Sequence, residues 1–201
     1  QSMEFHELIE LKKYHLAISE ALFGSRCLRH VHGIVGVTGE IARYEQKRTN
    51  TNQNMVCIPN GINTSKYPLR TPHTADPHER LDALFIGSIS SWHGLDRLLQ
   101  GMTNDKNFFL HIIGEGEQEK ALKTLACSLN IEKNVSFYGF RNKDEVSHLY
   151  DTCHFAVASL GIFRKRLSQA SPLKTREYAA RGIPFVSGYT DPDFPSSLPW
   201  I

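Results

Sequence analysis

The chain has 201 residues, of which 40% are hydrophobic and 22% are charged, and its formal net charge is +2. This composition is ordinary for a globular protein, and the length allows one large core or one domain with part of another. The balanced charge gives no support for a nucleic-acid partner. No segment approaches the roughly 18 consecutive apolar residues of a membrane span, and no signal peptide is visible. We therefore expect a cytoplasmic protein.

The four cysteines, Cys27, Cys57, Cys127 and Cys153, are widely spaced and form no C-x-x-C pair. Three of them have apolar neighbours in the sequence. This pattern favours reduced thiols in the core over disulfides or a zinc site.

The first third of the chain predicts helices within residues 4–26 and short strands at 33–37 and 55–58. Between these strands, Thr38 is expected to cap a helix that runs to about Lys47. Residues 68–79 contain three prolines and two histidines but little apolar material, which is typical of an interdomain linker. The predicted domains are therefore residues 1–67 and 80–201.

From residue 80 onward, apolar runs typical of strands alternate with helical patterns. The strands are expected at 83–86, 108–113, 135–138, 154–158 and 183–187. This alternation predicts βαβ units, and hence a Rossmann-like parallel sheet with helices on both faces. Ligands of such sheets bind outside the carboxyl ends of the strands, so we expect the function to lie in the loops that follow them.

The last predicted helix, residues 171–182, has both ends marked in the sequence. Ser171 is expected as its N-cap with Pro172 at the first helical position, and Gly182 supplies a left-handed exit. The free amides of Leu173 and Lys174 would point out of its N-terminus. With the basic residues 164–166 just before it, this helix predicts an anion site.

Glu177 lies one turn inside this helix and allows two interpretations. It can form an intrahelical ion pair with Arg181, which stabilises a helix by a few tenths of a kcal/mol. Alternatively, its carboxylate accepts hydrogen bonds from the hydroxyls of a ligand whose phosphates occupy the helix N-terminus.

Two other loops contain candidate site residues. Gly114 and Gly116 form a G-x-G pair, but Glu119 stands where the dinucleotide fingerprint needs a third glycine, so a simple tight turn is the favoured interpretation. Ser88 and His93 lie in the loop after the first strand of the second domain. The alternative for His93 is a capping or surface role.

Several short blocks, in the same order, resemble the sugar-nucleotide-dependent glycosyltransferases of family 4. Two examples are Ile-Pro-Asn-Gly-Ile at 58–62 and Ser-Pro-Leu-Lys at 171–174. The others lie at 36–41, 85–88, 92–96, 112–116, 134–139, 177–180 and 182–184. Each block is degenerate alone, but the ordered set covers nearly all of the chain.

The resemblance implies the two-Rossmann GT-B fold. Residues 1–67 would be the tail of the N-terminal, acceptor-side domain, and residues 80–201 most of the donor-binding domain, truncated at its C-terminus. The chain would then be a fragment that binds a nucleoside diphosphate but transfers no sugar, and the rest of the N-terminal domain would be a further partner.

The family's donor site can be carried over by position. Glu177 matches the second of two paired glutamates and would hold the ribose, whereas the first falls on Gln169. The family's usual arginine and lysine after the first strand fall on Ser88 and His93, and our hypothesis is that Lys174 or one of residues 164–166 supplies the missing charge. In this comparison the diphosphate would lie on the amides of Leu173 and Lys174, and the base beside Phe140 and Arg141. The implied donor-binding set is Gly87, Ser88, His93, Gly94, Gly114, Gly116, Gly139, Phe140, Arg141, Ser171, Leu173, Lys174 and Glu177.

The resemblance implies transfer of a sugar, with retention, from a nucleoside-diphosphate sugar to a glycan or lipid-linked acceptor in bacterial surface polysaccharide synthesis. It implies no cofactor and no essential metal, and no aspartate pair suited to a metal-bound diphosphate stands out. It also leaves open a peripheral association of the full-length protein with the cytoplasmic face of a membrane. Two alternatives remain: a sugar-nucleotide epimerase of similar architecture, and a non-catalytic GT-B-like partner protein.

Overall fold

The computed structural model of the chain describes residues 8–9, 12–49, 52–71, 80–104 and 107–194. The chain divides into two compact units, Gln1–Pro59 and Asn60–Ile201. Residues 60–67 group with the second unit in this division, and Arg70, within the expected linker, contacts the same unit. Its main-chain N–H donates to the Arg181 carbonyl (3.0 Å), and its guanidinium donates to the carbonyls of Cys153 and His154. Residues 72–79 of the expected linker lie outside the described residues.

The first unit contains a helix–strand–helix–strand arrangement. Its elements are α2 (Tyr14–Ser19), the π-helical turn η1 (Glu20–Gly24), α3 (Ser25–Leu28), β1 (Gly33–Gly36), α4 (Gly39–Thr49) and β2 (Asn54–Cys57). The two strands pair in parallel. Thr38 caps α4 as predicted, since its buried Oγ1 accepts a hydrogen bond from the Ile41 amide at 3.2 Å.

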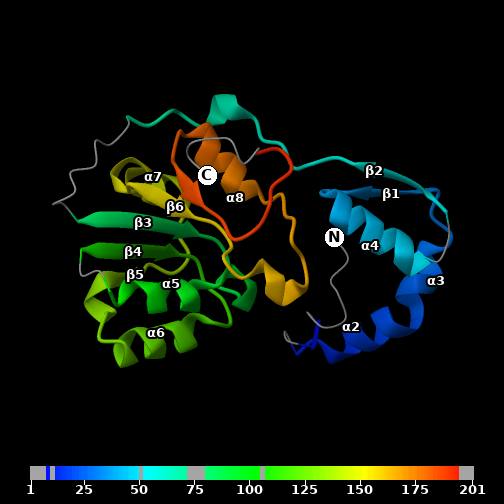
Figure 1. The fold of residues 1–201 in the computed structure, drawn as a ribbon, viewed down its shortest axis with the longest axis horizontal. Helices are drawn as coiled ribbons and strands as arrows, with labels where there is room; N and C mark the ends of the chain where they lie inside the picture. The colour runs from blue at the N-terminus through cyan, green and yellow to red at the C-terminus, as the bar shows by residue number, and fades with distance from the viewer. Residues whose placement is uncertain (1–7, 10–11, 50–51, 72–79, 105–106, 195–201) are drawn as a thin grey trace. The chain divides into compact units, whose positions relative to one another are not determined.

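The second unit is built on one five-stranded parallel sheet (Figure 1). Its strands are β3 (Leu81–Ile86), β4 (Phe108–Ile113), β5 (Val135–Phe137), β6 (Phe155–Val157) and β7 (Phe185–Val186). Its helices are α5 (Leu95–Met102), α6 (Glu119–Ser128), α7 (Lys143–Thr152) and α8 (Leu173–Ala180), with short 3-10 turns η2 (Thr64–Lys66), η3 (Ser91–His93), η4 (Glu132–Asn134) and η5 (Ile162–Lys165). The predicted α/β class is confirmed.

Alternating residues of β3 face two different cores, as the period of a strand requires. Phe85 packs in the core that α5 and α6 cover, whereas Leu84 packs in the core that α7 and α8 cover. Figure 1 shows these two helix pairs on opposite faces of the sheet. Both faces are thus buried, which is the normal condition of an all-parallel sheet.

The strand order β5-β4-β3-β6-β7 places β3 at the centre of the sheet. From β3 the chain first adds strands on one side and then crosses to add β6 and β7 on the other. The order therefore reverses between β3 and β6, and ligands of such sheets bind at that switch point, outside the carboxyl ends of the strands. The loops that follow β3 and β6 are the ones to examine for function.

The four cysteines are free thiols, but Cys153 alone among them is buried. The expectation that several lie in the core was wrong, because apolar sequence neighbours do not bury a residue on the outer face of a helix or strand. Among the helices that the structure describes, none is long and apolar enough to cross a membrane.

Candidate functional site

The loops after β3 and β6 are packed directly against each other at the switch point. Gly94 has a φ of +65°, and a Cβ there would lie 2.7 Å from the Gly161 nitrogen. The Leu160 amide donates to the His93 carbonyl at 2.9 Å. Because backbone meets backbone here, glycine is required at position 94 and the two loops form one unit.

The basic residue Arg164 links the loop after β6 to the loop after β3. Its guanidinium donates to both carboxylate oxygens of Asp96, at 2.7 and 2.9 Å, and to the Ser91 carbonyl at 2.6 Å. This bidentate pair holds Arg164 against the segment that precedes α5. Arg164 is therefore committed to a structural contact, although the sequence made it a candidate for the missing charge.

The glycines of the loop after β4 are explained by close packing. A Cβ on Gly114 would lie 2.0 Å from the Gly87 carbonyl oxygen, and a Cβ on Gly116 would lie 2.3 Å from the Ile89 carbonyl oxygen. Gly87 and Gly114 also have φ values of +145° and +126°, which disfavour any side chain. The tight-turn interpretation of this G-x-G pair therefore accounts for both glycines.

The loop after β5 joins the same edge of the sheet. The Gly114 amide donates to the Gly139 carbonyl at 2.9 Å, and the Phe140 amide donates to Glu115 Oε1 at 3.3 Å. The side chain of Phe140 is 73% exposed, and Arg141 beside it is exposed as well. The four loops that hold the predicted residues thus all lie at the carboxyl ends of the strands. In the sheet, β4 and β3 separate the strand before the first of the outer loops, β5, from the strand before the other, β6.

The start of α8 differs from the prediction in one respect. The helix begins at Leu173 with Pro172 as its N-cap, and no side chain caps it. Ser171 does not cap because its Oγ accepts hydrogen bonds from Arg176 Nη2 at 2.7 Å and from the Asn60 amide at 3.1 Å. The first helical amides, which have no acceptor within a helix, remain without a side-chain cap. The predicted exit is confirmed, since Gly182 follows the helix with a φ of +70°.

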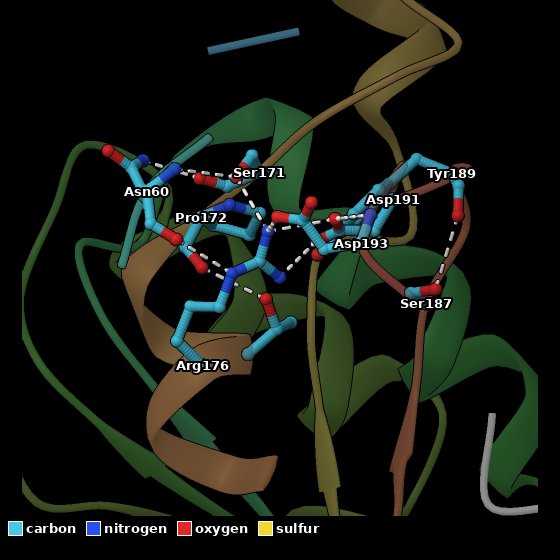
Figure 2. A network of polar contacts seen from close by, with 9 residues as sticks. Asn60, Ser171, Pro172, Arg176, Ser187, Tyr189, Asp191 and Asp193 are labelled. Atoms are coloured by element: carbon cyan, nitrogen blue, oxygen red, sulfur yellow. Dashed lines mark hydrogen bonds and ion pairs between the residues drawn. The ribbon is translucent and has the colours of Figure 1, made fainter. Parts of the chain in front are cut away.

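Arg176 is the centre of a buried polar network that the sequence analysis did not identify (Figure 2). Its Nη1 and Nη2 donate to the two carboxylate oxygens of Asp191, at 2.7 and 2.9 Å, and Nη2 also donates to Asp193 at 2.6 Å. Its Nε donates to the Asn60 carbonyl at 2.9 Å. The only hint of this network in the sequence is the pair of aspartates, Asp191 and Asp193, after the last strand. The network fixes the backbone that leads into α8.

Glu177 has two partners in the structure. The Tyr150 hydroxyl donates to its Oε1 at 2.9 Å, and Arg181 Nε lies 3.6 Å from the same oxygen. The ion pair with Arg181 is therefore present, and Tyr150 is an addition that the sequence did not suggest. Burial, followed by the charge of Glu177, raises the pKa of Tyr150, so this hydroxyl keeps its proton. The Glu177 side chain stays 21% exposed, which leaves it accessible to a ligand.

Of the two positions where the resemblance expects cations, Ser88 is exposed and His93 is only 6% exposed. His93 Nδ1 accepts a hydrogen bond from the Ser90 amide at 3.3 Å, which is the capping interpretation. Burial lowers the pKa of His93 to about 3, and the charges of Lys174 and Lys165 act in the same direction. His93 is therefore neutral at pH 7 and cannot supply the missing positive charge.

The pH dependence of stability tests this description of His93. Its folded pKa lies below the ordinary value of 6.5, so the unfolded chain binds the additional proton. Neutral His93 therefore contributes fully to the free energy of unfolding above pH 6.5. This contribution is lost as the pH falls toward 3, by up to about 1.4 kcal/mol per pH unit. We expect His93→Asn, whose amide oxygen can replace Nδ1 as an acceptor, to remove this slope. Urea unfolding of both proteins between pH 4 and 8 measures it, and parallel curves would contradict the assignment.

Among the described residues, no group of three or more histidine, cysteine, aspartate or glutamate side chains could hold a metal ion.

Comparison with known proteins identifies the type of domain. A family model described as glycosyl transferases group 1 matches residues 71–192. The sucrose-phosphate synthase of Thermosynechococcus elongatus superposes with a TM-score of 0.65 at 16% identity, covering 83% of this chain and 43% of its own. The lipopolysaccharide outer core galactosyltransferase WaaB gives 0.60 at 17% identity, with coverages of 79% and 44%. Anabaena HepE, in complex with UDP and glucose, gives 0.58 at 16% identity, with coverages of 85% and 47%.

This chain thus spans less than half the length of each of these three proteins. At such low identity the likeness establishes the fold, the α/β parallel sheet of GT-B glycosyltransferases. No curated protein matches the sequence.

Proposed function

The chain belongs to the group 1 glycosyl transferases, and from this premise we propose that its second unit binds the donor of a sugar-transfer reaction, a nucleoside-diphosphate sugar. The observation that carries the proposal is the start of α8. It lies after β6, at the switch point of the sheet, and no side chain caps it. Open amides at a helix N-terminus, together with the helix dipole, attract a diphosphate.

The spacing along α8 suits the rest of a nucleotide. Glu177 follows Leu173 by four residues, which corresponds to about 6 Å along a helix axis. A diphosphate on the amides of Leu173 and Lys174 would thus place its ribose beside the Glu177 carboxylate, which accepts hydrogen bonds only. Tyr150 holds that carboxylate in position. Phe140 and Arg141, exposed at the loop after β5, are proposed to contact the base.

The chemistry proposed is loss of the nucleoside diphosphate from the sugar and its replacement by an acceptor hydroxyl, with retention, as in family 4. The C–O bond between sugar and phosphate breaks, and its electrons go to the diphosphate. The acceptor oxygen bonds to the same carbon, and its proton passes to the departing phosphate oxygen. Amides and a helix dipole aimed at that oxygen stabilise the developing charge without reorganising. No metal or cofactor enters the proposal.

The biological setting is proposed from the relatives. One similar solved structure is called a lipopolysaccharide outer core galactosyltransferase, and another is described as a glycosyltransferase involved in lipopolysaccharide biosynthesis. These names support an acceptor that is a glycan or a lipid-linked glycan of a bacterial surface polysaccharide. We propose a cytoplasmic protein, with peripheral association at the cytoplasmic face of a membrane as a further proposal for the full-length protein.

A second candidate, a non-catalytic GT-B-like partner protein, is favoured by one observation. The three positions where the resemblance expects charge are occupied by Ser88, neutral His93 and Gln169. Product analysis of the full-length protein with candidate sugar nucleotides distinguishes the two. Consumption of the donor with transfer of its sugar supports the enzyme, whereas an unchanged donor supports the partner protein.

The position of the phosphate tests the donor site directly. We expect the 201-residue chain to bind UDP or GDP in calorimetry, with the phosphates against the amides of Leu173 and Lys174 in soaked crystals. The competing turn at Gly116 is flanked by Glu115, Glu117 and Glu119, which repel anions. Phosphates found at Gly116 and away from Leu173 would contradict the proposed site, and no binding of either nucleotide would contradict the proposed function.

A further inference from the structure

The amine of Lys174 is buried without a hydrogen-bond partner among the described residues. Its Nζ lies 4.1 Å from the centroid of the Phe85 ring and 3.1 Å from the place where a Cβ on Gly87 would stand. Burying an amine that makes no hydrogen bond costs free energy. Each such group in a folded protein requires an explanation.

Packing alone does not explain a lysine at this position. A methionine would fill the same space beside Phe85 with no amine to desolvate. The place of the amine is informative, because Gly87 directly follows β3 at the switch point and Lys174 is in the first turn of α8. Two other cations nearby are committed, Arg164 to Asp96 and Arg176 to Asp191. Lys174 therefore lies at the proposed diphosphate site with its amine over the Phe85 ring and no hydrogen-bond partner among the described residues.

We propose that Lys174 supplies the cation of the donor site by leaving its contact with Phe85 and Gly87 when a diphosphate binds at the N-terminus of α8, taking up a proton and pairing with the phosphate. This inference rests on the proposed function and adds to it. The cation that the resemblance places in the loop after β3 has moved to the helix that follows β6. The flexible four-carbon stem of lysine allows this movement without a change of backbone.

The proton balance follows from the surroundings of the amine. Burial lowers the pKa of Lys174 to about 7. Burial is the one cause of this shift, and the titratable group coupled to the Lys174 amine is His93 of η3. The pKa of His93 is lowered by burial and then by the charge of Lys174, so His93 is neutral and offers the amine no anion. Above pH 7 the free amine is therefore largely neutral, and the bound phosphate supplies the anion that favours its protonated form.

Calorimetry of UDP binding tests the inference with the 201-residue chain. Titrations at pH 8 in two buffers of different ionisation enthalpy give the number of protons taken up per UDP. We expect an uptake approaching one proton in the wild type, and an affinity that falls by up to about tenfold per pH unit above pH 7. Lys174→Met should lose this uptake and bind UDP about tenfold more weakly at pH 7. Lys174→Arg should retain binding but lose the pH dependence, because arginine is always charged.

The controls distinguish this inference from the proposed function. Lys133→Met removes an exposed lysine of η4, just before β5 and thus at the amino-terminal ends of the strands. It should change neither the proton uptake nor the UDP affinity. Thermal melts at pH 7 should show Lys174→Met at least as stable as the wild type, because the substitution removes a buried amine. Equal UDP affinity and equal proton uptake in the wild type and Lys174→Met would overturn the inference while leaving the donor site intact. Absence of UDP and GDP binding to the wild type would instead overturn the proposed function.

Discussion

Replacing Arg176 by methionine is expected to destabilise the second unit by about 3–5 kcal/mol, the usual cost of removing one partner from a buried ion pair. The side chains of Arg176 and Asp191 are only 9% and 5% exposed. Methionine fills much of the same volume but leaves the Asp191 carboxylate buried without its cation. The Ser171 hydroxyl and the Asn60 carbonyl lose a donor as well. Equilibrium unfolding in urea, followed by circular dichroism, measures the change.

Arg164→Met provides the matched control. Arg164 also forms a bidentate pair with an aspartate, but its side chain and that of Asp96 are 31% and 37% exposed. Exposed pairs contribute about 0.2–1 kcal/mol, so this variant should lose much less stability. Adding Asp191→Asn to Arg176→Met should recover part of the loss, because the uncompensated charge is removed. Equal losses for the two arginines would show that burial of the pair is not what stabilises this region.

Replacing Glu177 by glutamine is expected to weaken nucleotide binding by about ten- to a hundredfold while leaving the fold intact. A hydrogen bond to a charged group contributes about 1.5–3 kcal/mol, and about 1.4 kcal/mol corresponds to a tenfold change in affinity. If Glu177 only pairs with Arg181, its loss costs about 0.2–0.5 kcal/mol of stability and the affinity hardly changes. Titrating both proteins with UDP and GDP, alongside thermal melts, distinguishes the two roles.

Glu119→Gln is the appropriate control for Glu177→Gln. Glu119 pairs with Lys123 four residues later on α6, at 2.6 Å, so it reproduces the intrahelical pair without the proposed ribose contact. Its substitution should lower stability slightly and leave nucleotide affinity unchanged. A 2′,3′-dideoxy nucleotide provides an independent check, since it should bind the wild type poorly and lose little more on Glu177→Gln. Unchanged affinity in Glu177→Gln would return Glu177 to a purely structural role.

The sheet could be predicted from the sequence because its signals are local. Apolar runs marked each strand of the second unit, and Gly182 marked the end of α8 by a conformation that other residues avoid. The loops of the site followed from the topology, since parallel strands place all their carboxyl ends at one edge.

The parts that could not be predicted depend on residues far apart in the chain. Ser171 is a good N-cap by its sequence neighbours alone. In the structure its hydroxyl instead accepts hydrogen bonds from Arg176 and from Asn60, which lies 111 residues earlier. Tyr150 lies 27 residues before Glu177, and only the packing of α7 beside α8 makes it a partner. The burial of the Lys174 amine against Phe85 likewise depends on tertiary packing, which periodicity and propensity do not describe.

The contacts of Arg176 also constrain the order in which this unit can fold. The guanidinium joins Asn60, 116 residues earlier, to Asp191 and Asp193, so its full set of partners exists only after nearly the entire unit has been synthesised. Contacts that close such long loops cost chain entropy and form late. During synthesis on the ribosome, the sheet strands β3 to β6 are available before the segment that fixes the start of α8. The structural support of the proposed phosphate site is therefore a late product of folding.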